Sequence, residues 1–395
     1  MQPDASPFRP GQPVPAELFV GRQDAIERLR GLVRTADRGV FKIGFISGER
    51  GIGKSSLASF VRHLSEREGS VAGCHVYLGG VHDLHEMARR TFDRLLKDSI
   101  DRPWYQHVAQ FFGDRVRKVG LFGVSVELAL SNNDLRTISG NFISSIRQLL
   151  NTVEDKTSLL LILDDINGLA NSTNFANWLK SIVDEAATSQ HTTQLCILVV
   201  GLEERRQELI RNQPSLARVF DLVDIAPWSD DEVAQFFQRS FTRENAVLPA
   251  GGLDYLVRNT GGLPVLAHEI GDAVWRAAGT PTFTLDELVA GVFQAAEIIG
   301  RKLLEPQVFR AIQSDRYRSI LRKMAGESLR MSFRRGELAA RLEEEERRVL
   351  DNFLRRMRTL GALEIDPDTR GGYRFPNRLY ALYFGMQAQL QPRRR

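Results

Sequence analysis

The stretch ISGERGIGKSS, residues Ile46–Ser56, decides the fold of this 395-residue chain. Its glycines, lysine and serine have the spacing G-x-x-x-x-G-K-[ST]. In this pattern glycines allow backbone N–H groups to surround a phosphate chain, the lysine reaches the β- and γ-phosphates, and the serine hydroxyl ligates Mg²⁺. We therefore predict a nucleoside triphosphate and Mg²⁺ site. The segment, named the phosphate loop below, consists of Gly48, Glu49, Arg50, Gly51, Ile52, Gly53, Lys54, Ser55 and Ser56.

The residues on either side of the phosphate loop fit a strand followed by a helix. The apolar run between Val40 and Ile46 is typical of a buried strand, and apolar residues recur at helical spacing from Leu57 to Leu64. A glycine-rich turn without a ligand is the alternative. The flanking strand and helix favour the nucleotide site, because the motif requires that context.

Two acidic residues supply the second chemical signal. The apolar run in SLLLILDDING, residues Ser158–Gly168, ends at Asp164 and Asp165. A carboxylate at the end of a strand can hold Mg²⁺, and the next one can activate the attacking water. We assign Asp164 to the metal and Asp165, with Lys54, to catalysis. The alternative, a strand that simply ends at a polar turn, is disfavoured by the phosphate loop.

Composition and patterning indicate a globular α/β protein. Hydrophobic residues make up 43% of the chain and charged residues 26%, with a net charge of only +4, which permits a local nucleic-acid patch without requiring one. Strands that are apolar on both faces alternate with helices, so we predict a parallel sheet covered by helices, as in P-loop NTPases. The predicted parts are a flexible arm (1–17), an α/β core (18–228) with a helical insertion (81–157), a helical lid (229–300) and a winged-helix domain (307–391).

The expected cellular setting follows from the cysteines and the apolar runs. Cys74 and Cys196 lie in apolar runs without a C-x-x-C pattern, which favours a reducing compartment over disulfides or zinc. The N-terminus MQPDASPFRPGQPVP lacks an apolar core, and no apolar run is long enough to span a bilayer. We expect a cytoplasmic protein without membrane contact. His82 and His85 lack a clear third ligand, so no metal besides Mg²⁺ is expected.

Several motifs together resemble a known group. FVGR (Phe19–Arg22), the phosphate loop, LLLILDD, and SLARVF followed by DIAPWSDDEV are similar to segments of AAA+/STAND P-loop ATPases. Within this group the chain resembles origin-recognition-like ATPase domains and NB-ARC/NACHT-type switch ATPases, over roughly Phe19 to Ala278. The resemblance implies ATP as the nucleotide. It also places Val20, Gly21 and Arg22 near the adenine and ribose, although this loop can instead pack the first helix on the sheet.

The resemblance also points to an arginine that acts between subunits. It makes Gln194–Val200 the sensor-1 strand, but Gly201 and Leu202 stand where a polar or basic residue is frequent. Arg205 and Arg206 follow this strand only after several residues, which disfavours contact with a γ-phosphate. Arg218 is the better candidate for an arginine finger in a neighbouring subunit of a homo-oligomer, and a surface arginine is the alternative.

A glycine-proline segment favours the STAND relatives. GGLPVLAHEIG, residues Gly261–Gly271, resembles their GxP motif, in which Pro264 would pack on the nucleotide base. Proline in the first turn of a helix is the simpler alternative, because it needs no N–H partner there. A sensor-2 arginine, usual in origin-type proteins, is missing from this helix. We expect His268 to pack within the lid.

The C-terminal pattern of three helices, a hairpin and a last helix predicts a winged helix that could place its third helix in duplex DNA. Candidate phosphate contacts are Arg347, Arg348, Arg355, Arg356 and Arg358 on that helix and Arg370 and Arg374 on the wing. The four acids Glu343–Glu346 lie at the expected start of that helix, where base contact would occur, and their negative charge disfavours contact with DNA.

Two functional hypotheses of different class remain from the sequence, and a third possibility is a nucleotide-locked scaffold that hydrolyses ATP poorly. One is a STAND-like signalling or defence ATPase whose nucleotide state controls oligomerisation and engagement of a separately encoded effector. The other is a DNA-associated AAA+ regulator or loader of the replication, transposition or transcription type. The glycine-proline segment favours the first, and the arginine-rich C-terminal domain with Arg393, Arg394 and Arg395 favours the second.

Overall fold

The fold is described from a computed structural model that covers residues 6–100, 105–119, 125–153, 155–278, 280–325 and 330–390. These residues form two compact units. One consists of residues 13–226, and the other of residues 6–12 together with 227–390. Arg393, Arg394 and Arg395 lie outside the described residues.

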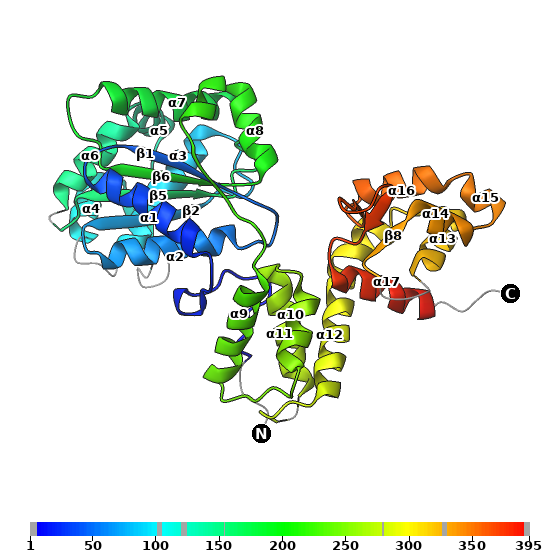
Figure 1. The fold of residues 1–395 in the computed structure, drawn as a ribbon. Coiled ribbons are helices and arrows are strands. Elements are labelled where there is room, and N and C mark those ends of the chain that lie inside the picture. Colours follow the sequence, from blue (N-terminus) through cyan, green and yellow to red (C-terminus); the bar gives the residue numbers. More distant parts are fainter. Residues whose placement is uncertain are drawn as a thin grey trace. The chain divides into compact units, whose positions relative to one another are not determined.

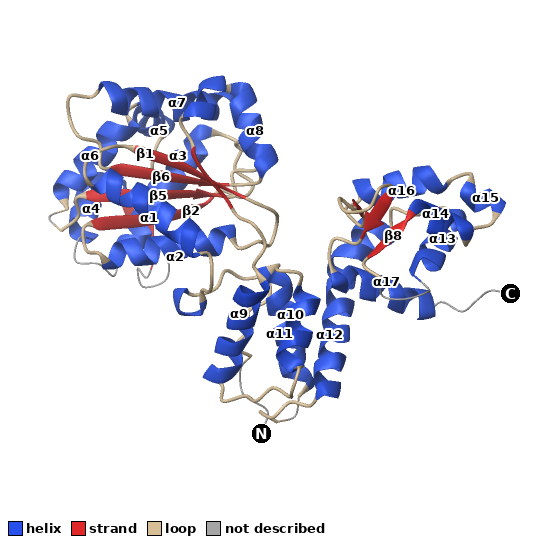
Figure 2. Ribbon diagram, viewed as in Figure 1, coloured by secondary structure: helices blue, strands red, loops and turns tan. Residues whose placement is uncertain are grey.

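A five-stranded parallel sheet forms the centre of the first unit (Figures 1 and 2). Its strand order is β2-β5-β6-β1-β7. The strands are β1 (Lys42–Ser47), β2 (Val71–Tyr77), β5 (Ser158–Asp164), β6 (Leu195–Val200) and β7 (Asp221–Asp224). The central strands β5 and β6 are buried along their whole length, as expected for a sheet with both faces covered. The predicted P-loop NTPase-type α/β fold is thereby confirmed.

Helices cover both faces of this sheet. Figure 1 shows α1 (Gln23–Asp37) and α2 (Lys54–Arg67) on one side, and α7 (Thr173–Thr188) and α8 (Glu203–Asn212) on the other. Short 3-10 turns, η1 (Ala16–Leu18) and η4 (Pro214–Arg218), precede α1 and β7. Alternate strand residues such as Phe45 and Leu161 share one core with α7 and α8.

The expected helical insertion is only partly helical. It contains α3 (Leu84–Ser99), α4 (Tyr105–Phe112), η2 (Gly113–Arg115), β3 (Val116–Val119), β4 (Ser125–Leu128), α5 (Asn132–Gly140) and α6 (Phe142–Thr152). Helix α4 ends at Phe112, because Gly113 adopts a left-handed φ of 55° and the chain then passes through η2 into β3. Phe92 of α3 and Phe142 of α6 are fully buried in the core of the sheet unit, so the insertion is part of that core.

Four helices begin the second unit: α9 (Asp230–Arg243), α10 (Gly252–Thr260), α11 (Pro264–Ala277) and α12 (Leu285–Ile299). Phe8, from the segment expected to be flexible, is 3% exposed and packs on Phe236, Phe237 and Phe241 with ring centroids 5.3–6.1 Å apart. Residues 6–12 therefore contribute to a core, because the buried Phe8 ring packs on aromatic residues even though prolines surround it in the sequence. Residues 1–5 lie outside the described residues.

The chain continues from α12 through the π-helix η5 (Gly300–Phe309) into small helices and a small sheet. The elements are α13 (Asp315–Ala325), β8 (Ser332–Arg334), α14 (Arg335–Ala340), α15 (Glu344–Arg347), α16 (Leu350–Thr359), β9 (Glu364–Ile365), β10 (Gly372–Arg374) and α17 (Arg378–Leu390). The sheet is antiparallel with the order β8-β10-β9. The expected hairpin is β9–β10, whereas β8 is too short for the sequence pattern to reveal.

Candidate functional site

The phosphate loop depends on three glycines with left-handed backbones. The φ angles of Gly48, Gly51 and Gly53 are 145°, 76° and 94°. A Cβ on Gly48 would lie 2.9 Å from the carbonyl oxygen of Ile225, in the segment that follows β7. The loop therefore turns closely against this backbone, and only glycine fits at its first position.

The loop ends at a helix start whose amide groups have no helical partner. Gly53 is the N-cap of α2 and provides no side-chain cap. The first helical bond joins the Leu57 N–H to the Gly53 oxygen at 2.9 Å, so the amides of Lys54, Ser55 and Ser56 precede the helical pattern. The positive end of the helix adds to these donors. The loop thus fits a phosphate chain.

Lys54 is held inside the loop. Its Nζ donates to the carbonyl oxygens of Gly48 (2.9 Å) and Glu49 (2.6 Å). Burial lowers the pKa of Lys54, while the negative charges of Asp164 and Asp165 act in the opposite direction. The ammonium therefore lies within the field of both predicted acids.

The strand register explains why these acids act on the loop. In the sheet, Val200 of β6 pairs with Ile46 of β1 on one side and with Asp164 of β5 on the other. Because β6 lies between them, Asp164 is level with the start of the phosphate loop at about 10 Å, two strand spacings. Parallel strands thus bring the loop and the acids to one edge of the sheet.

The two acids have different surroundings. Asp164 is 3% exposed, and its Oδ2 lies 2.8 Å from His75 Nε2. Asp165 is exposed and has a left-handed φ of 57°, which is uncommon for a residue other than glycine. Asn167 Nδ2 donates a hydrogen bond to its Oδ1. The structure therefore separates a buried carboxylate from an exposed one on a strained backbone.

The segment predicted to approach the adenine borders the loop. Val20 is buried, and Gly21 and Arg22 both have positive φ angles. The Arg22 guanidinium donates to the carbonyl oxygen of Ile52 at 2.7 Å and to that of Ala226 at 2.8 Å. Arg22 therefore fastens the phosphate loop to the chain after β7, a role that the sequence did not indicate.

The candidates beyond β6 have different surroundings, and the first of them, Gly201, donates its N–H to the Ile46 oxygen beside the phosphate loop at 3.1 Å. Gly201 is buried at the end of β6, and Arg205 and Arg206 form ion pairs with Glu208 and Glu203 of their own helix. Arg218 is exposed at the end of η4, where β7 is about to begin, whereas the phosphate loop follows the end of β1. Its proposed action in a neighbouring subunit remains a prediction.

The remaining predicted residues belong mainly to the second unit. Pro264 is the first residue of α11 and is buried, and its contact with a base remains a prediction. His268 is 5% exposed, lies edge-on to Phe236, and accepts a hydrogen bond from the Arg9 N–H at 3.1 Å, as a packing residue would. In the first unit, His82 and His85 are exposed. Among the described residues, no group of three or more His, Cys, Asp or Glu is arranged to hold a metal.

His75 is the main residue that sequence reasoning missed. It lies in the short strand β2 and contacts Asp164, a residue 89 positions later in the chain. A single histidine in an apolar strand gave a weak signal, because its partner depends on which strands pair.

The acids Glu343–Glu346 do not lie at the start of α16. Glu344 to Glu346 belong to the separate helix α15, and α16 begins at Leu350. Within residues 307–390, Glu346 pairs with Lys323 at 2.7 Å, Glu345 with Arg316 at 2.9 Å and Glu344 with Arg348 at 2.6 Å. The expectation that they occupy the start of the third helix is wrong, since the helical pattern is interrupted at Val349 (ψ 0°).

The parallel sheet, the glycine loop and the helix start define a P-loop nucleoside triphosphatase. Within this class, the family model of the AAA ATPase domain matches residues 18–249. The chain belongs to this AAA ATPase domain family. Among the described residues, no helix is both long and apolar enough to cross a membrane.

Solved structures show the same fold at low sequence identity. The Walker-type ATPase PABY2304 of Pyrococcus abyssi is 16% identical with a TM-score of 0.53, over 93% of this chain and 96% of that one. The ORC2 protein of Aeropyrum pernix in ADPNP-ADP complexes is 14% identical with a TM-score of 0.57, over 93% and 92%. Cdc6p of Pyrobaculum aerophilum is 13% identical with a TM-score of 0.50, over 95% and 98%. No curated protein matches significantly in sequence.

Proposed function

We propose that this protein binds ATP with Mg²⁺ and hydrolyses it to ADP and phosphate. The observation that carries the proposal is the phosphate loop, with the amides of Lys54, Ser55 and Ser56 at an uncapped helix start and the charges of Asp164 and Asp165 acting on Lys54. Membership of the AAA ATPase domain family supports it. The structures of ORC2 in ADPNP-ADP complexes support the choice of nucleotide.

Each residue of the site has a distinct task in this proposal. The loop amides donate to phosphate oxygens, and Lys54 exchanges the carbonyls of Gly48 and Glu49 for those oxygens. Ser55 and Asp164 would hold Mg²⁺, which would neutralise charge on the phosphates when it is bound. Arg22 keeps the Ile52 carbonyl turned away from the phosphates.

Asp165 is the proposed base for the attacking water. It is exposed on the same edge of the sheet, and its carboxylate accepts a hydrogen bond from Asn167. Asn167 binds the Oδ1 atom of Asp165, so the other carboxylate oxygen, Oδ2, is the one that would orient the water. A carboxylate in this place can accept a proton as the water attacks.

We infer further that hydrolysis serves a switch. ATP and ADP can favour different arrangements only if the protein binds them with unequal affinity in each arrangement. Arg218, exposed before β7, would act on the nucleotide of a neighbouring copy and so couple turnover to homo-oligomerisation. Pro264 would pack on the base, and a separately encoded effector would receive the signal in the cytoplasm.

Two substitutions test the ATPase proposal. Lys54→Ala should abolish nucleotide binding, since it removes the only lysine of the loop, and Asp165→Asn should keep binding but stop turnover. Binding is measured by calorimetry with ADPNP and turnover by phosphate release, and Lys42→Ala, on β1 but outside the loop, is the control. Undiminished binding by the Lys54 variant would contradict the proposal.

A second candidate function is a DNA-associated AAA+ regulator. The observation that favours it is α16, on which Arg355, Arg356 and Arg358 are exposed, while the four acids lie before its start. The order helix, strand, helices and hairpin supports our interpretation of residues 307–390 as a winged helix. In that interpretation α16 would approach the major groove of duplex DNA.

Matched triple variants separate the two candidates. Replacing Arg355, Arg356 and Arg358 by Gln should weaken duplex binding and reduce its dependence on salt. The control replaces by Gln the residues Arg301, Arg316 and Arg335, which pair with Glu297, Glu345 and Asp351, and changes the net charge equally. Salt-dependent binding that both triples reduce equally, or no stimulation of turnover by duplex, would favour the effector-coupled switch.

A further inference from the structure

The contact between His75 and Asp164 is a buried pair next to the nucleotide site. The side chains are 3% and 4% exposed, and His75 Nε2 lies 2.8 Å from Asp164 Oδ2. An ionised carboxylate can only accept hydrogen bonds, so Nε2 is the donor. One of the two Asp164 oxygens is therefore held by a side chain from another strand.

The pairing of β2 with β5 produces this contact. The register places His75 opposite Ile162 and Tyr77 opposite Asp164, so His75 and Asp164 are diagonal neighbours on one face of the sheet. Asp165 follows the strand and is exposed. His75 thus contacts the carboxylate assigned to the metal and leaves the proposed base to Asn167.

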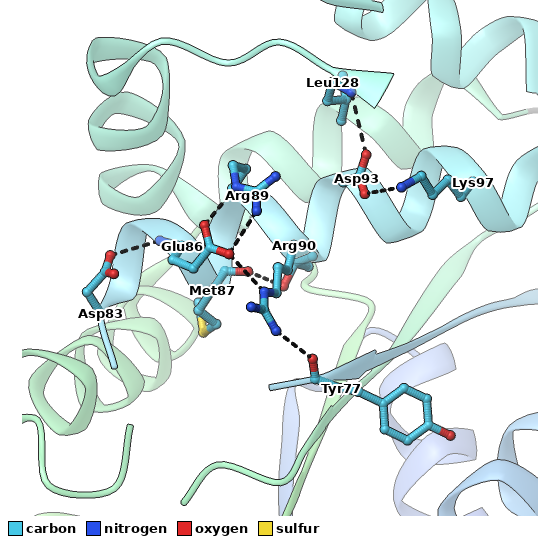
Figure 3. Close-up of polar contacts among 10 residues, drawn as sticks. Tyr77, Asp83, Glu86, Met87, Arg89, Arg90, Asp93, Lys97 and Leu128 are labelled. Atoms are coloured by element: carbon cyan, nitrogen blue, oxygen red, sulfur yellow. Dashed lines mark hydrogen bonds and ion pairs between the residues drawn. The ribbon is translucent and has the colours of Figure 1, made fainter. Parts of the chain in front are cut away.

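The imidazole is held in place from a second side. The Tyr77 ring stacks on it with centroids 4.5 Å apart and an interplanar angle of 20°. The Tyr77 backbone oxygen accepts a bond from Arg90 Nη1 at 3.4 Å, and Arg90 in turn binds Glu86 at 2.8 Å (Figure 3). The end of β2 is therefore tied to α3, and the half-exposed Tyr77 ring covers one face of the imidazole.

We propose that His75 is a positioning residue for Asp164. By occupying Oδ2, it fixes the rotation of the carboxylate and leaves Oδ1 for the metal ion or for a water bound to it. Partners of this kind orient a ligand without touching the ion. The inference rests on the proposed Mg²⁺-ATP site and adds a residue outside the phosphate loop and the acidic pair.

A purely structural role is the competing explanation. A buried carboxylate needs a hydrogen-bond donor for stability alone, whatever its function. That role predicts that His75 variants lower stability and leave the metal dependence of nucleotide binding unchanged. The positioning role predicts a selective effect on the metal.

The test compares ADPNP affinity with Mg²⁺ and with a chelator in the full chain. His75→Leu should reduce the gain in affinity that Mg²⁺ provides by about 10- to 100-fold, while the affinity without Mg²⁺ stays near that of the wild type. His75→Gln, which keeps a donor, should recover part of the gain. Val76→Ala, a buried neighbour on the same strand, is the control for lost stability.

The outcomes separate the inference from the proposed function. If the Mg²⁺-dependent gain of His75→Leu equals that of Val76→Ala, His75 has no positioning role even though the wild type binds Mg²⁺-ADPNP. If the wild type binds no ADPNP, the proposed function fails and the inference with it. If His75→Leu does not fold, His75→Met, which also lacks a donor, replaces it: a Mg²⁺-dependent gain equal to that of the wild type overturns the inference, and a reduced gain supports it.

Discussion

Two helix starts with left-handed glycines have opposite surroundings in this molecule. Gly53 (φ 94°) precedes α2, and Gly261 and Gly262 (φ 61° and 73°) precede α11, and neither helix has a side-chain cap. At α2 the first amides lack helical partners. At α11 the first residue is Pro264, which has no N–H, and the Gly262 oxygen accepts a bond from the Trp228 N–H at 2.8 Å.

The difference shows that a glycine-rich helix start can serve two purposes. In the phosphate loop, glycine lets amides turn towards a ligand, and Lys54 supplies a charge. Before α11, glycine lets two backbones approach, since a Cβ on Gly262 would lie 2.5 Å from the Trp228 oxygen. Similar local sequence therefore gives an uncapped helix start with amides outside the helical pattern in one place and a closed packing contact in the other.

The largest expected effect is a loss of nucleotide affinity, caused by a substitution that disturbs the phosphate loop before the open helix start. Gly48→Ala places a Cβ against the Ile225 oxygen and should displace the loop, reducing ADPNP affinity by about 1,000-fold, or about 4 kcal/mol. Calorimetry measures it. Gly69→Ala has a similar left-handed φ of 99° but open space around its Cβ, and should leave affinity unchanged. Equal affinities for the two variants would contradict the role of Gly48.

The next effect concerns acid sensitivity near the closed helix start. Burial lowers the pKa of His268 to about 4, with the nearby Asp272 acting to raise it. In the unfolded state the pKa of His268 keeps its ordinary value of 6.5, so between pH 6.5 and pH 4 the unfolded state binds more protons than the folded state. The contribution of neutral His268 to the free energy of unfolding is therefore fully present above pH 6.5. It is lost as the pH falls towards 4, by up to about 3 kcal/mol.

Hydrogen exchange of the α11 amides at pH 7 and pH 5 measures this loss. His268→Gln cannot titrate and should remove the difference in this range, whereas His191→Gln, which replaces an exposed histidine of the other unit, should retain it. An unchanged difference in the His268 variant would assign the acid sensitivity to other groups.

A smaller loss should follow from Gly262→Ala. The added Cβ forces the backbone away from Trp228, and the left-handed φ adds strain, together about 2 kcal/mol of unfolding free energy. Urea unfolding followed by tryptophan fluorescence measures it. Gly251→Ala, with a φ of 72° and an open surrounding, isolates the strain alone. The comparison fails if the two variants are equally stable.

The smallest expected effect concerns Pro264 and tests whether the closed helix start of α11 contributes to nucleotide binding. If the Pro264 ring packs on the base, Pro264→Ala removes about two buried methylene groups and weakens ADPNP binding by about tenfold. Tripolyphosphate, which lacks a base, should bind both proteins equally. Unchanged ADPNP affinity would leave α11 with a packing role only.

The sequence predicted the local parts of the site because they are encoded locally. The phosphate loop, its strand and its helix are contiguous, and Asp164 and Asp165 end an apolar run whose length is typical of a buried strand. The parallel sheet followed from alternating strands and helices. The strand order did not, so the distance of Asp164 from the loop across β6 became clear only from the register.

What could not be predicted depends on contacts between distant segments. His75 meets Asp164, and Arg22 meets Ile52 and Ala226, through pairings that no periodicity encodes. Proline-rich composition hid Phe8, whose partners are more than 200 residues away. A continuous helical pattern also concealed the break at Val349, because a single non-helical residue leaves the spacing nearly unchanged.

The left-handed backbone of Asp165 limits which residues can occupy this position. Short polar side chains tolerate such a conformation better than longer ones, and an aspartate loses the least energy among the acids. A glutamate would extend the carboxylate by one methylene group at a greater conformational penalty. The turn therefore favours the shorter of the two acids at the position of the proposed base, at the cost of the extra reach that a glutamate would give.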